Sequence, residues 1–341
     1  MKILAIIQCW DNQDQVRGFT VGWMEKLADK AEELVILTLE QRQPSTKTNM
    51  FIYSLGKEKY QGFWRRFYYL YQWHRQMKKI IRKHSPQVIF THMAPIYSVL
   101  AYPYARPSIP IITWFLHPKI HFFIKLAHWL SAKVVSASEN SYPYKKDKLV
   151  ALGHGIDTDL FAPGGSPESP PLILSVGRIS RVKNYETLLR AAKGQKVFII
   201  GSPITDEDKI YFKELEQYQD QVEFLPALPR KELVNWYHKC SLHVNSTSPG
   251  SGDKVSLEAM ACGRPTLMAA STFADSLSGF KDKLIFKYQD EKDLTDKINY
   301  WLSLSVPERE KIGLELRQKI VKDHSLDHLT DGLIGLFQSL N

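Results

Sequence analysis

The sequence has few cysteines and no pattern that would bind a metal. Its 341 residues include three cysteines, Cys9, Cys240 and Cys262, with no CxxC and no cluster of histidine and cysteine at metal-ligand spacing. Disulfide frameworks and zinc sites both depend on such closely spaced residues. The sequence therefore predicts reduced thiols and no metal site.

Long apolar runs are also missing. The run ILAII after Lys2 ends at Gln8, which is too short for the apolar region of a signal peptide or for a membrane span. No other stretch reaches membrane-spanning length without charges. We therefore expect a cytoplasmic protein, at most peripheral on the inner face of a membrane. The motif GxGxxG is absent after the first predicted strand, which disfavours a dinucleotide-binding protein.

The composition is that of a folded protein with an anionic partner. A hydrophobic content of 44% and a charged content of 24% are typical of globular proteins, and the length suits two domains. The formal net charge of +9 favours a nucleotide, an anionic membrane or a nucleic acid as partner.

Segments of strand type and helix type alternate along the chain. Such alternation predicts the fold class α/β, with two Rossmann-like, doubly wound parallel sheets. Strands are expected at 2–7, 33–40, 86–93, 109–118, 133–140, 172–177, 196–203, 222–228, 241–246, 265–269 and 283–288, of which those at 2–7 and 172–177 are expected to be buried, and helices at 19–30, 120–132, 185–193, 206–219, 230–240, 306–324 and 326–341. The segment between His92 and the next strand, residues 94–107, is expected to be exposed.

A short strand and a Gly/Pro-rich crossing, both expected within 148–165, divide this pattern into two halves. The expected domains are an N-terminal domain at 1–153, a linker at 154–170, a C-terminal domain at 171–305 and helices at 306–341 that pack back toward the N-terminal domain. Two such domains imply a cleft that receives substrates from both sides. Asp157 and Asp159 in the linker form a DxD pattern, which we interpret as turn-forming residues without a metal.

Residues 57–84 are unusually basic and aromatic. Nine Lys or Arg residues stand against one Glu and are interleaved with Phe, Trp and Tyr. One interpretation is a helix that packs its rings on the sheet and leaves its charges in solvent. The segment has more rings than one buried stripe needs, so contact with an anionic membrane surface is also predicted. No nucleic-acid-binding motif accompanies it, and no nucleic acid is expected as a partner.

Residues 245–265 (NSTSPGSGDKVSLEAMACGRP) pass from a Gly/Ser loop into a helix that ends at Gly263 and Pro265. A loop that leads into a helix N-terminus presents unpaired backbone N–H groups and the positive end of the helix dipole, which suit a phosphate. The alternative is an ordinary loop-to-helix connection.

Four segments together carry a family resemblance. GHGIDTDLFAP (153–163), LSVGRISRVKNYETLLRAA (174–192), VEFLPALPRKEL (222–233) and the stretch at 245–265 resemble the retaining glycosyltransferases of family 4, which have the GT-B fold. The resemblance implies transfer of a hexose or N-acetylhexosamine from a nucleotide-diphosphate sugar, with UDP favoured over GDP. The C-terminal domain would hold this donor without a metal, and the N-terminal domain would hold a glycan or lipid-linked acceptor of cell-surface polysaccharide or glycolipid synthesis.

Within this resemblance, several residues are expected to hold the donor. Arg178 follows Gly177 at a strand end and Lys183 precedes the next helix, so both are assigned to the diphosphate, whose charge grows as the sugar departs. By resemblance, Glu258 accepts hydrogen bonds from the ribose and the backbone around Leu228 borders the base. Further hydrogen bonds to the diphosphate are expected from the amides of Ser251, Gly252, Asp253, Lys254 and Val255.

Two residues of the N-terminal domain complete the expected site. The resemblance implies that His117 hydrogen-bonds the donor sugar close to the reaction centre. Gly18 lies in the loop after the first strand, an edge where such sheets bind ligands. No protein nucleophile is apparent. The expected mechanism is therefore a same-face attack in which the leaving phosphate accepts the proton of the acceptor.

Gly250 departs from the family pattern of two glutamates separated by seven residues. Counting back from Glu258 puts Gly250 at the first glutamate, which usually touches the donor sugar. One interpretation is that Asp253 takes over this contact and Lys254 assists the phosphate or pairs with Asp253. The other is that both residues only cap and solubilise the start of the helix.

Two other functions stay open. A catalytically silent GT-B protein would serve as a scaffold or partner at the membrane, and Gly250 would then mark the loss of sugar binding. The nucleotide-sugar 2-epimerases share the fold but are expected to carry more acids and histidines in the cleft.

Overall fold

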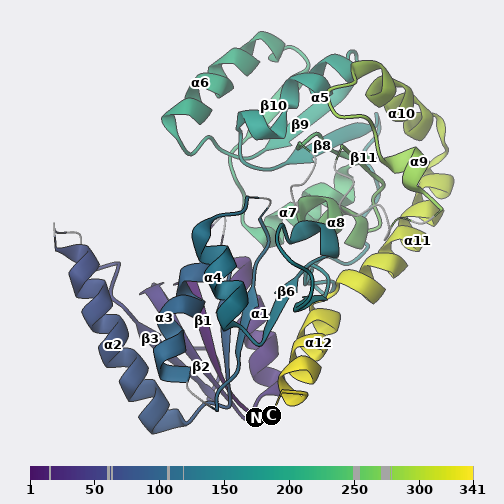
Figure 1. Cartoon of the computed structure of the whole chain (residues 1–341). Coiled ribbons are helices and arrows are strands. Elements are labelled where there is room, and N and C mark those ends of the chain that lie inside the picture. Colours follow the sequence, from purple (N-terminus) through teal and green to yellow (C-terminus); the bar gives the residue numbers. More distant parts are fainter. Residues whose placement is uncertain are drawn as a thin grey trace. The chain divides into compact units, whose positions relative to one another are not determined.

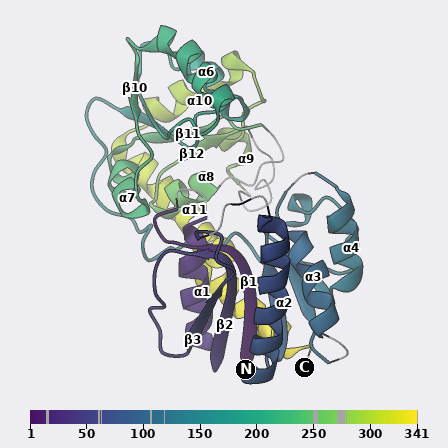
Figure 2. The ribbon, with the colours of Figure 1, turned by 90° about the vertical axis from the view of Figure 1, so that its left-hand side faces the viewer.

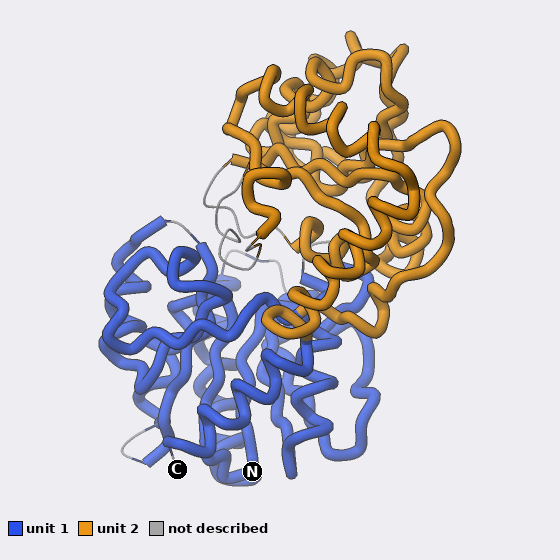
Figure 3. Tube along the Cα trace, turned by 90° about the vertical axis from the view of Figure 1, so that its right-hand side faces the viewer, with its two compact units in different colours: residues 1–155, 326–341 blue, residues 156–325 orange. Residues whose placement is uncertain are grey.

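The computed structural model describes residues 1–14, 17–59, 62, 64–105, 108–117, 119–248, 254–269, 277 and 279–340. They form two compact units, unit 1 (residues 1–155 and 326–341) and unit 2 (residues 156–325), coloured separately in Figure 3. The chain leaves unit 1 after Gly155 and returns to it after Ser325. Both crossings come later in the chain than the expected boundaries at residues 153 and 305.

Unit 1 contains a seven-stranded parallel sheet with the strand order β3-β2-β1-β4-β5-β6-β7. Figure 1 labels its strands β1, β2, β3 and β6. Its strands are β1 (Lys2–Trp10), β2 (Glu33–Gln41), β3 (Met50–Ser54), β4 (Val88–His92), β5 (Ile111–Trp114), β6 (Lys133–Ser136) and β7 (Leu149–Ala151). Its helices are α1 (Phe19–Lys30), α2 (Arg65–His84), α3 (Pro95–Ala105), α4 (Phe122–Leu130) and α12 (Leu326–Gln338), with a short 3₁₀ turn η1 (Glu139–Ser141).

Strand β1 is buried on both of its faces because helices cover both sides of the sheet. Ile3, Ala5 and Ile7 belong to the core formed with α1 and α12. Leu4 and Ile6 point the other way, into the core formed with α2 and α3. A strand covered on both faces shows a continuous apolar run instead of an alternating one. The prediction of a buried first strand is confirmed.

Unit 2 contains a five-stranded parallel sheet with the strand order β10-β9-β8-β11-β12. Its strands are β8 (Leu172–Val176), β9 (Lys196–Ile200), β10 (Val222–Leu225), β11 (Leu242–Asn245) and β12 (Thr266–Met268). Its helices are α5 (Tyr185–Ala191), α6 (Asp206–Leu215), α7 (Arg230–Lys239), α8 (Lys254–Ala261), α9 (Lys281–Leu284), α10 (Glu291–Ser303) and α11 (Val306–His324), with 3₁₀ turns η2 (Arg181–Lys183) and η3 (Glu216–Tyr218).

The last two helices, α11 and α12, belong to different units. Arg317 of α11 donates hydrogen bonds to the carbonyl oxygens of Phe161 (2.8 Å) and Thr158 (3.1 Å), both in unit 2. Gly313 of α11 lies so close to the Gly263 carbonyl that no side chain would fit there. Helix α12 instead packs on α1 in unit 1. The helices expected together at 306–341 are therefore divided at Ser325.

Two sequence predictions are wrong. Residues 283–288, expected as a strand, contain the end of α9 and a single bridge between Ile285 and Met268, because the segment lies beside β12 without continuing the ladder. Residues 94–107, expected to be exposed, contain α3. Ser98 of α3 is fully buried, and its hydroxyl is hydrogen-bonded to the hydroxyls of Thr91 and Thr113. This polar residue lies on the buried face of the helix, so the sequence pattern did not predict burial. Strand β3 and helix α10 have no counterpart among the predictions.

Gly155, the last residue before the first crossing, should not tolerate a side chain. Its φ is +63°, and a Cβ would lie 2.8 Å from the Trp23 ring and against Leu329. We predict that Gly155→Ala lowers the free energy of unfolding by about 2 kcal/mol or more, because strain and overlap add. Urea unfolding followed by circular dichroism measures this change.

The matched control is Gly22→Ala in α1, where a Cβ meets nothing within 4 Å. Alanine favours a helix over glycine, so this variant should gain about 0.5–1 kcal/mol. Equal effects of the two substitutions would contradict the packing described at Gly155.

Candidate functional site

In unit 2 the chain changes direction across the sheet between β8 and β11. From β8 the strands run outward through β9 to β10, and the chain then crosses to β11 and β12 on the other side. Loops that leave two such strands in opposite directions make room for a ligand at the carboxyl ends of the strands. The loop after β8 and the loop after β11 contain the residues predicted to bind a diphosphate.

Lys183 folds back over the end of β8. Its Cε and Nζ lie 2.6 Å from the point that a Cβ of Gly177 would occupy, and the φ of Gly177 is +148°. A Cβ on Gly201, the residue after β9, would lie 1.9 Å from the carbonyl oxygen of Gly177, and the Tyr185 hydroxyl donates to the same oxygen at 2.9 Å. The ammonium group of Lys183 therefore lies at the carboxyl end of β8, where the backbones approach closely. Its contact with a diphosphate stays a prediction.

Arg178 is held at the same strand end by an acid on α6. Its Nε lies 3.6 Å from Oδ2 of Asp208, and its side chain is still 47% exposed. Burial opposes ionisation of Asp208, but hydrogen bonds from the N–H groups of Thr205 and Ile204 and the charge of Arg178 outweigh it and lower the pKa of this acid. Arg178 is thus oriented by a carboxylate and keeps guanidinium surface for an anion.

Helix α8 begins beside a cluster of charged side chains. Glu258 is 7% exposed, and its Oε1 lies 3.6 Å from Nη2 of Arg230. Its Oε2 accepts a hydrogen bond from the Tyr237 hydroxyl at 3.4 Å. The Arg230 guanidinium also lies over the Phe161 ring, 5.0 Å from the ring centroid. Helix α7, which supplies Arg230 and Tyr237, therefore orients the carboxylate of Glu258.

Lys254 adds a second cation to this cluster. Its Nζ is buried at the first residue of α8. Burial lowers the pKa of Lys254 well below its ordinary value, the nearby charge of Arg230 lowers it further, and Glu258 opposes both. Arg230 and Lys254 thus place two basic side chains beside the carboxylate of Glu258.

The two loops at the direction change are hydrogen-bonded to each other and to α8. The Ser246 hydroxyl donates to the carbonyl of Lys183 at 2.7 Å. The side-chain amide of Asn245 donates to the Ser256 hydroxyl at 2.8 Å, and Oδ1 of Asn245 accepts from the N–H of Thr247 at 3.2 Å. The predicted site residues Gly250, Ser251, Gly252 and Asp253 lie outside the residues that the structure describes.

Leu228 and Val255 border this region as partly buried side chains that pack on the core of unit 2. The N–H of Ala227 donates to the Ser202 hydroxyl at 3.0 Å, which anchors the segment before α7 to the loop after β9. The backbone of Leu228 therefore follows the carboxyl edge of the sheet. Its predicted contact with a base is untested.

In unit 1, His117 is exposed beyond the end of β5. Its Nδ1 accepts a hydrogen bond from the N–H of Lys119 at 3.1 Å, so the proton of the neutral ring is on Nε2. Partial burial lowers the pKa of His117, and the charges of Lys119 and His121 lower it further. A neutral imidazole that carries its proton on Nε2 suits hydrogen bonding to a sugar, the role that the resemblance implies.

Gly18 precedes α1 at the corresponding edge of unit 1, next to the change of direction between β1 and β4. A Cβ at Gly18 would lie 2.6 Å from the carbonyl oxygen of Asp14 and 2.8 Å from that of Asn12. The glycine is therefore required by the fold of this loop. No contact described here tests its predicted role in ligand binding.

Cys9, Asp14 and Glu40 offer potential metal-ligand atoms within 4.8 Å of one another. Nη2 of Arg17 already lies 2.5 Å from Oδ2 of Asp14 and 3.1 Å from Oε1 of Glu40. Burial and a hydrogen bond to Glu40 raise the pKa of the Cys9 thiol to about 12. A protonated thiol and neutralised carboxylates do not suit a metal ion. We interpret the group as a charge network that anchors the loop.

The site contains residues that the sequence analysis missed. Arg230 and Tyr237 were expected only as parts of a helix, and an arginine at the first residue of a helix is too common to signal a site.

The linker acid Asp157 was predicted correctly as a turn former. Its Oδ1 accepts a hydrogen bond from the N–H of Leu160 at 3.0 Å.

Comparisons with known structures agree with this architecture. The sucrose-phosphate synthase of Thermosynechococcus elongatus superposes with a TM-score of 0.80 at 16% identity, over 100% of this chain and 99% of that one. Anabaena HepE, in a complex with UDP and glucose, gives a TM-score of 0.75 at 14% identity, over 99% and 100% of the two chains. The predicted fold class is confirmed, since two doubly wound parallel sheets of this kind define the GT-B fold.

Sequence comparison finds a family similarity in unit 2. Residues 157–319 match the family model described as glycosyl transferases group 1. The D-inositol 3-phosphate glycosyltransferase of Mycolicibacterium smegmatis is 33% identical over 156 residues, which cover 39% of this chain and 36% of that protein. The corresponding protein of Frankia alni is 29% identical over 168 residues, covering 40% and 41%. The matches thus span less than half of these relatives. Family 4 itself stays a prediction.

Lys254 should reduce the stability of the protein when no ligand is bound. We predict that Lys254→Met raises the melting temperature by about 3 °C or more at neutral pH, because an apolar side chain replaces a buried cation. The unfolded chain binds a proton more tightly than the folded one at this lysine. The loss of stability caused by burying the charged lysine is therefore complete below the pKa that Lys254 has in the folded protein. This loss disappears as the pH rises toward the ordinary pKa of lysine.

Thermal unfolding of both proteins across this pH range tests the sign. The gap in melting temperature should be widest at low pH and close toward alkaline pH. Lys281→Met is the control, since Lys281 also begins a helix but is exposed. A destabilised Lys254→Met protein, or a gap independent of pH, would refute the electrostatic description of this cluster.

Proposed function

We propose that the protein is a retaining glycosyltransferase that moves a hexose or N-acetylhexosamine from a nucleotide-diphosphate sugar to a glycan or lipid-linked acceptor. The observation that carries the proposal is the set of charges at the direction change of unit 2. Arg178 and Lys183 leave the end of β8, and Lys254 lies beside Glu258 at the start of α8. This set falls within the segment that matches glycosyl transferases group 1.

In the proposed reaction, the bond between the anomeric carbon and the β-phosphate oxygen breaks and the nucleoside diphosphate takes both electrons. Arg178 and Lys183 stabilise the growing negative charge, since they are already fixed at the strand end before the reaction. Fixed cations of this kind would make a divalent metal unnecessary. The acceptor hydroxyl attacks the same face of the sugar, and its proton passes to the leaving phosphate oxygen.

Glu258 has the geometry of a ribose ligand in this proposal. Arg230 and Tyr237 hold its carboxylate at the carboxyl edge, where a nucleotide would follow its diphosphate. UDP is favoured over GDP as the nucleotide, and the complex of Anabaena HepE with UDP and glucose is in keeping with this choice. His117 would donate its Nε2–H to the sugar. The second partner in the proposal is an anionic membrane surface, reached through residues 57–84, where a lipid-linked acceptor would be met.

The alternative function is a catalytically silent scaffold with the same fold. It would retain the family segment without binding a donor, and Gly250 in place of a glutamate is the feature that favours it. A nucleotide-sugar 2-epimerase would instead convert the donor in the absence of any acceptor.

Donor binding can be tested without knowing the acceptor. We predict that UDP or UDP-sugars raise the melting temperature in the presence of EDTA, because a ligand that binds only the folded state stabilises it by mass action. Arg178→Ala and Lys183→Ala should each reduce donor turnover, measured as hydrolysis of the UDP-sugar, by on the order of a hundredfold. Lys254→Met should bind UDP more weakly although the free protein is more stable.

The matched control is Arg190→Ala in α5, which removes an exposed arginine paired with Glu291 at 3.0 Å. It should retain both the shift and the turnover. Absence of a shift with UDP, GDP, ADP and their sugar conjugates would favour the scaffold. A shift that persists in Arg178→Ala and Lys183→Ala would remove their assignment to the diphosphate.

A further inference from the structure

Helix α2 presents an exposed stripe opposite its buried face. Its buried residues Trp73, Met77, Ile80 and His84 pack toward the sheet. At 3.6 residues per turn, Phe67, Tyr71, Arg75, Lys78 and Arg82 fall within about 80° of one another on the nearly opposite side. We call these five residues the α2 stripe. Its first part is aromatic and its second part is cationic.

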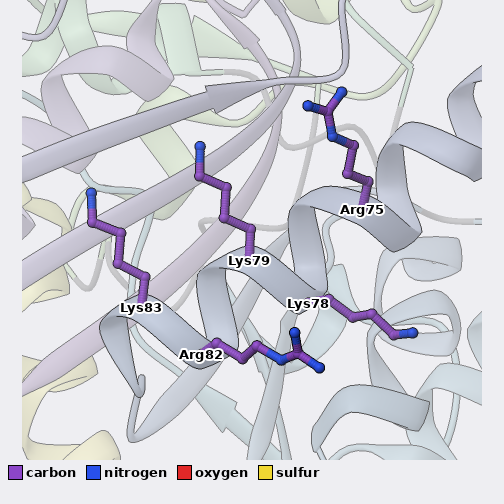
Figure 4. Close-up of a pocket in the computed structure, with 5 residues that line it drawn as sticks. All are labelled: Arg75, Lys78, Lys79, Arg82 and Lys83. Atoms are coloured by element: carbon purple, nitrogen blue, oxygen red, sulfur yellow. The ribbon is translucent and has the colours of Figure 1, made fainter.

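The cationic part of α2 is broader than the stripe. Arg75, Lys78, Lys79, Arg82 and Lys83 line an open pocket on the helix surface. In Figure 4 the side chains of Arg75, Lys79 and Lys83 extend to one side of the helix, while Lys78 and Arg82 extend to another. In the part of the chain that the structure describes, no ion pair with an acid is found for any of these five. Like charges so close together repel one another unless an anionic partner neutralises them.

The aromatic part of α2 is exposed to solvent. Phe67 is 67% exposed and Tyr71 is 63% exposed, and Trp64, just before the helix, is 62% exposed with its ring 5.6 Å from that of Phe67. Large apolar side chains gathered on a surface mark a site of interaction. Since the same helix already buries a full apolar stripe on the sheet, these rings are not required for packing within unit 1.

Helix α4 repeats this pattern. Phe122 and Trp129 are 69% and 71% exposed, and the exposed Lys125 lies between them on the same face at helical spacing. We call Phe122, Lys125 and Trp129 the α4 stripe. The rings of Phe122 and Phe123 are also in contact, with centroids 5.6 Å apart.

The two stripes belong to one layer of unit 1. Helix α3 packs against both α2 and α4, and Figures 1 and 2 show the three helices in this layer. Helix α2 follows β3 and α4 follows β5, and these strands are parallel members of one sheet. Both helices therefore begin at the carboxyl edge of the sheet, with Phe67 and Phe122 near their starts.

From this arrangement we infer that the outer layer of unit 1, through the α2 and α4 stripes together, is a docking surface for an anionic lipid bilayer. Aromatic side chains partition into the interfacial region of a bilayer, and neighbouring lysines and arginines contact anionic headgroups. The separation of rings and cations along α2 fits partial insertion of its first half and electrostatic contact by its second half. In the described part of the chain no helix has the length and apolar character needed to cross a bilayer, so the contact is peripheral.

The test is cosedimentation of the full chain with vesicles of phosphatidylcholine alone or with about one-third phosphatidylglycerol. The protein should bind the anionic vesicles and not the neutral ones, and salt should weaken binding. Combined Arg75→Glu, Lys78→Glu and Arg82→Glu should weaken binding about tenfold or more. Combined Phe122→Ser and Trp129→Ser should also weaken it, which separates a surface of two helices from a surface of α2 alone.

Matched controls lie in unit 2. Lys193→Glu, Lys209→Glu and Lys213→Glu together change the net charge by the same amount at exposed positions, and Ile204→Ser with Ile210→Ser removes two exposed apolar side chains. Both controls should retain vesicle binding. Quenching of tryptophan fluorescence by brominated lipids should fall in Trp129→Phe, which reports insertion of the α4 stripe directly.

The inference is overturned if the protein does not bind anionic vesicles, or if the unit 2 charge control weakens binding as much as the α2 variant. Binding to single-stranded RNA or self-association that depends on the stripes, without vesicle binding, would also overturn it. None of the substituted residues is assigned to donor binding. The inference rests on the membrane partner named in the proposed function and extends it to α4. UDP-dependent stabilisation should persist in every variant, so a failure of the membrane contact is distinguishable from a failure of donor binding.

Discussion

A parallel sheet covered by helices on both faces confines charged side chains to the ends of its strands and to the outer surfaces of its helices. Strand β1 shows this constraint in unit 1, where successive residues enter two different cores. In unit 2 the same constraint places Arg178 and Lys183 at the end of β8 and Lys254 at the start of α8. The location of the candidate site thus follows from the burial of the strands, and its chemistry follows from the loops.

The candidate site also brings charged side chains together in a way that lowers the stability of the folded protein. Lys254 and Arg230 are both close to the carboxylate of Glu258, and burial disfavours the ammonium form of Lys254. Gly177 and Gly201 allow backbones and the Lys183 side chain to approach more closely than other residues would permit.

Sequence reasoning succeeded where the relevant signal is local. The buried strands, most of the helices and the turn formed by Asp157 were predicted because apolar periodicity and turn residues act over a few positions. It failed at residues 94–107 and 283–288, where tertiary contacts override local pattern: buried hydroxyl groups accommodate Ser98 in the core, and a single bridge leaves Ile285 outside the sheet. Arg230 was missed for the same reason, since its partner Glu258 is distant in the sequence.

The sequence by itself determined the alternation of strands and helices, the two-sheet fold and the family segment at 157–319, because each depends on residue order along the chain. It also indicated Arg178, Lys183 and Glu258 as candidate ligands. The tertiary structure decided which charges from distant segments meet: Asp208 with Arg178, and Arg230 with Glu258. These pairings depend on the packing of distant elements, and hydrophobic periodicity contains no information about which helix end will lie beside which strand.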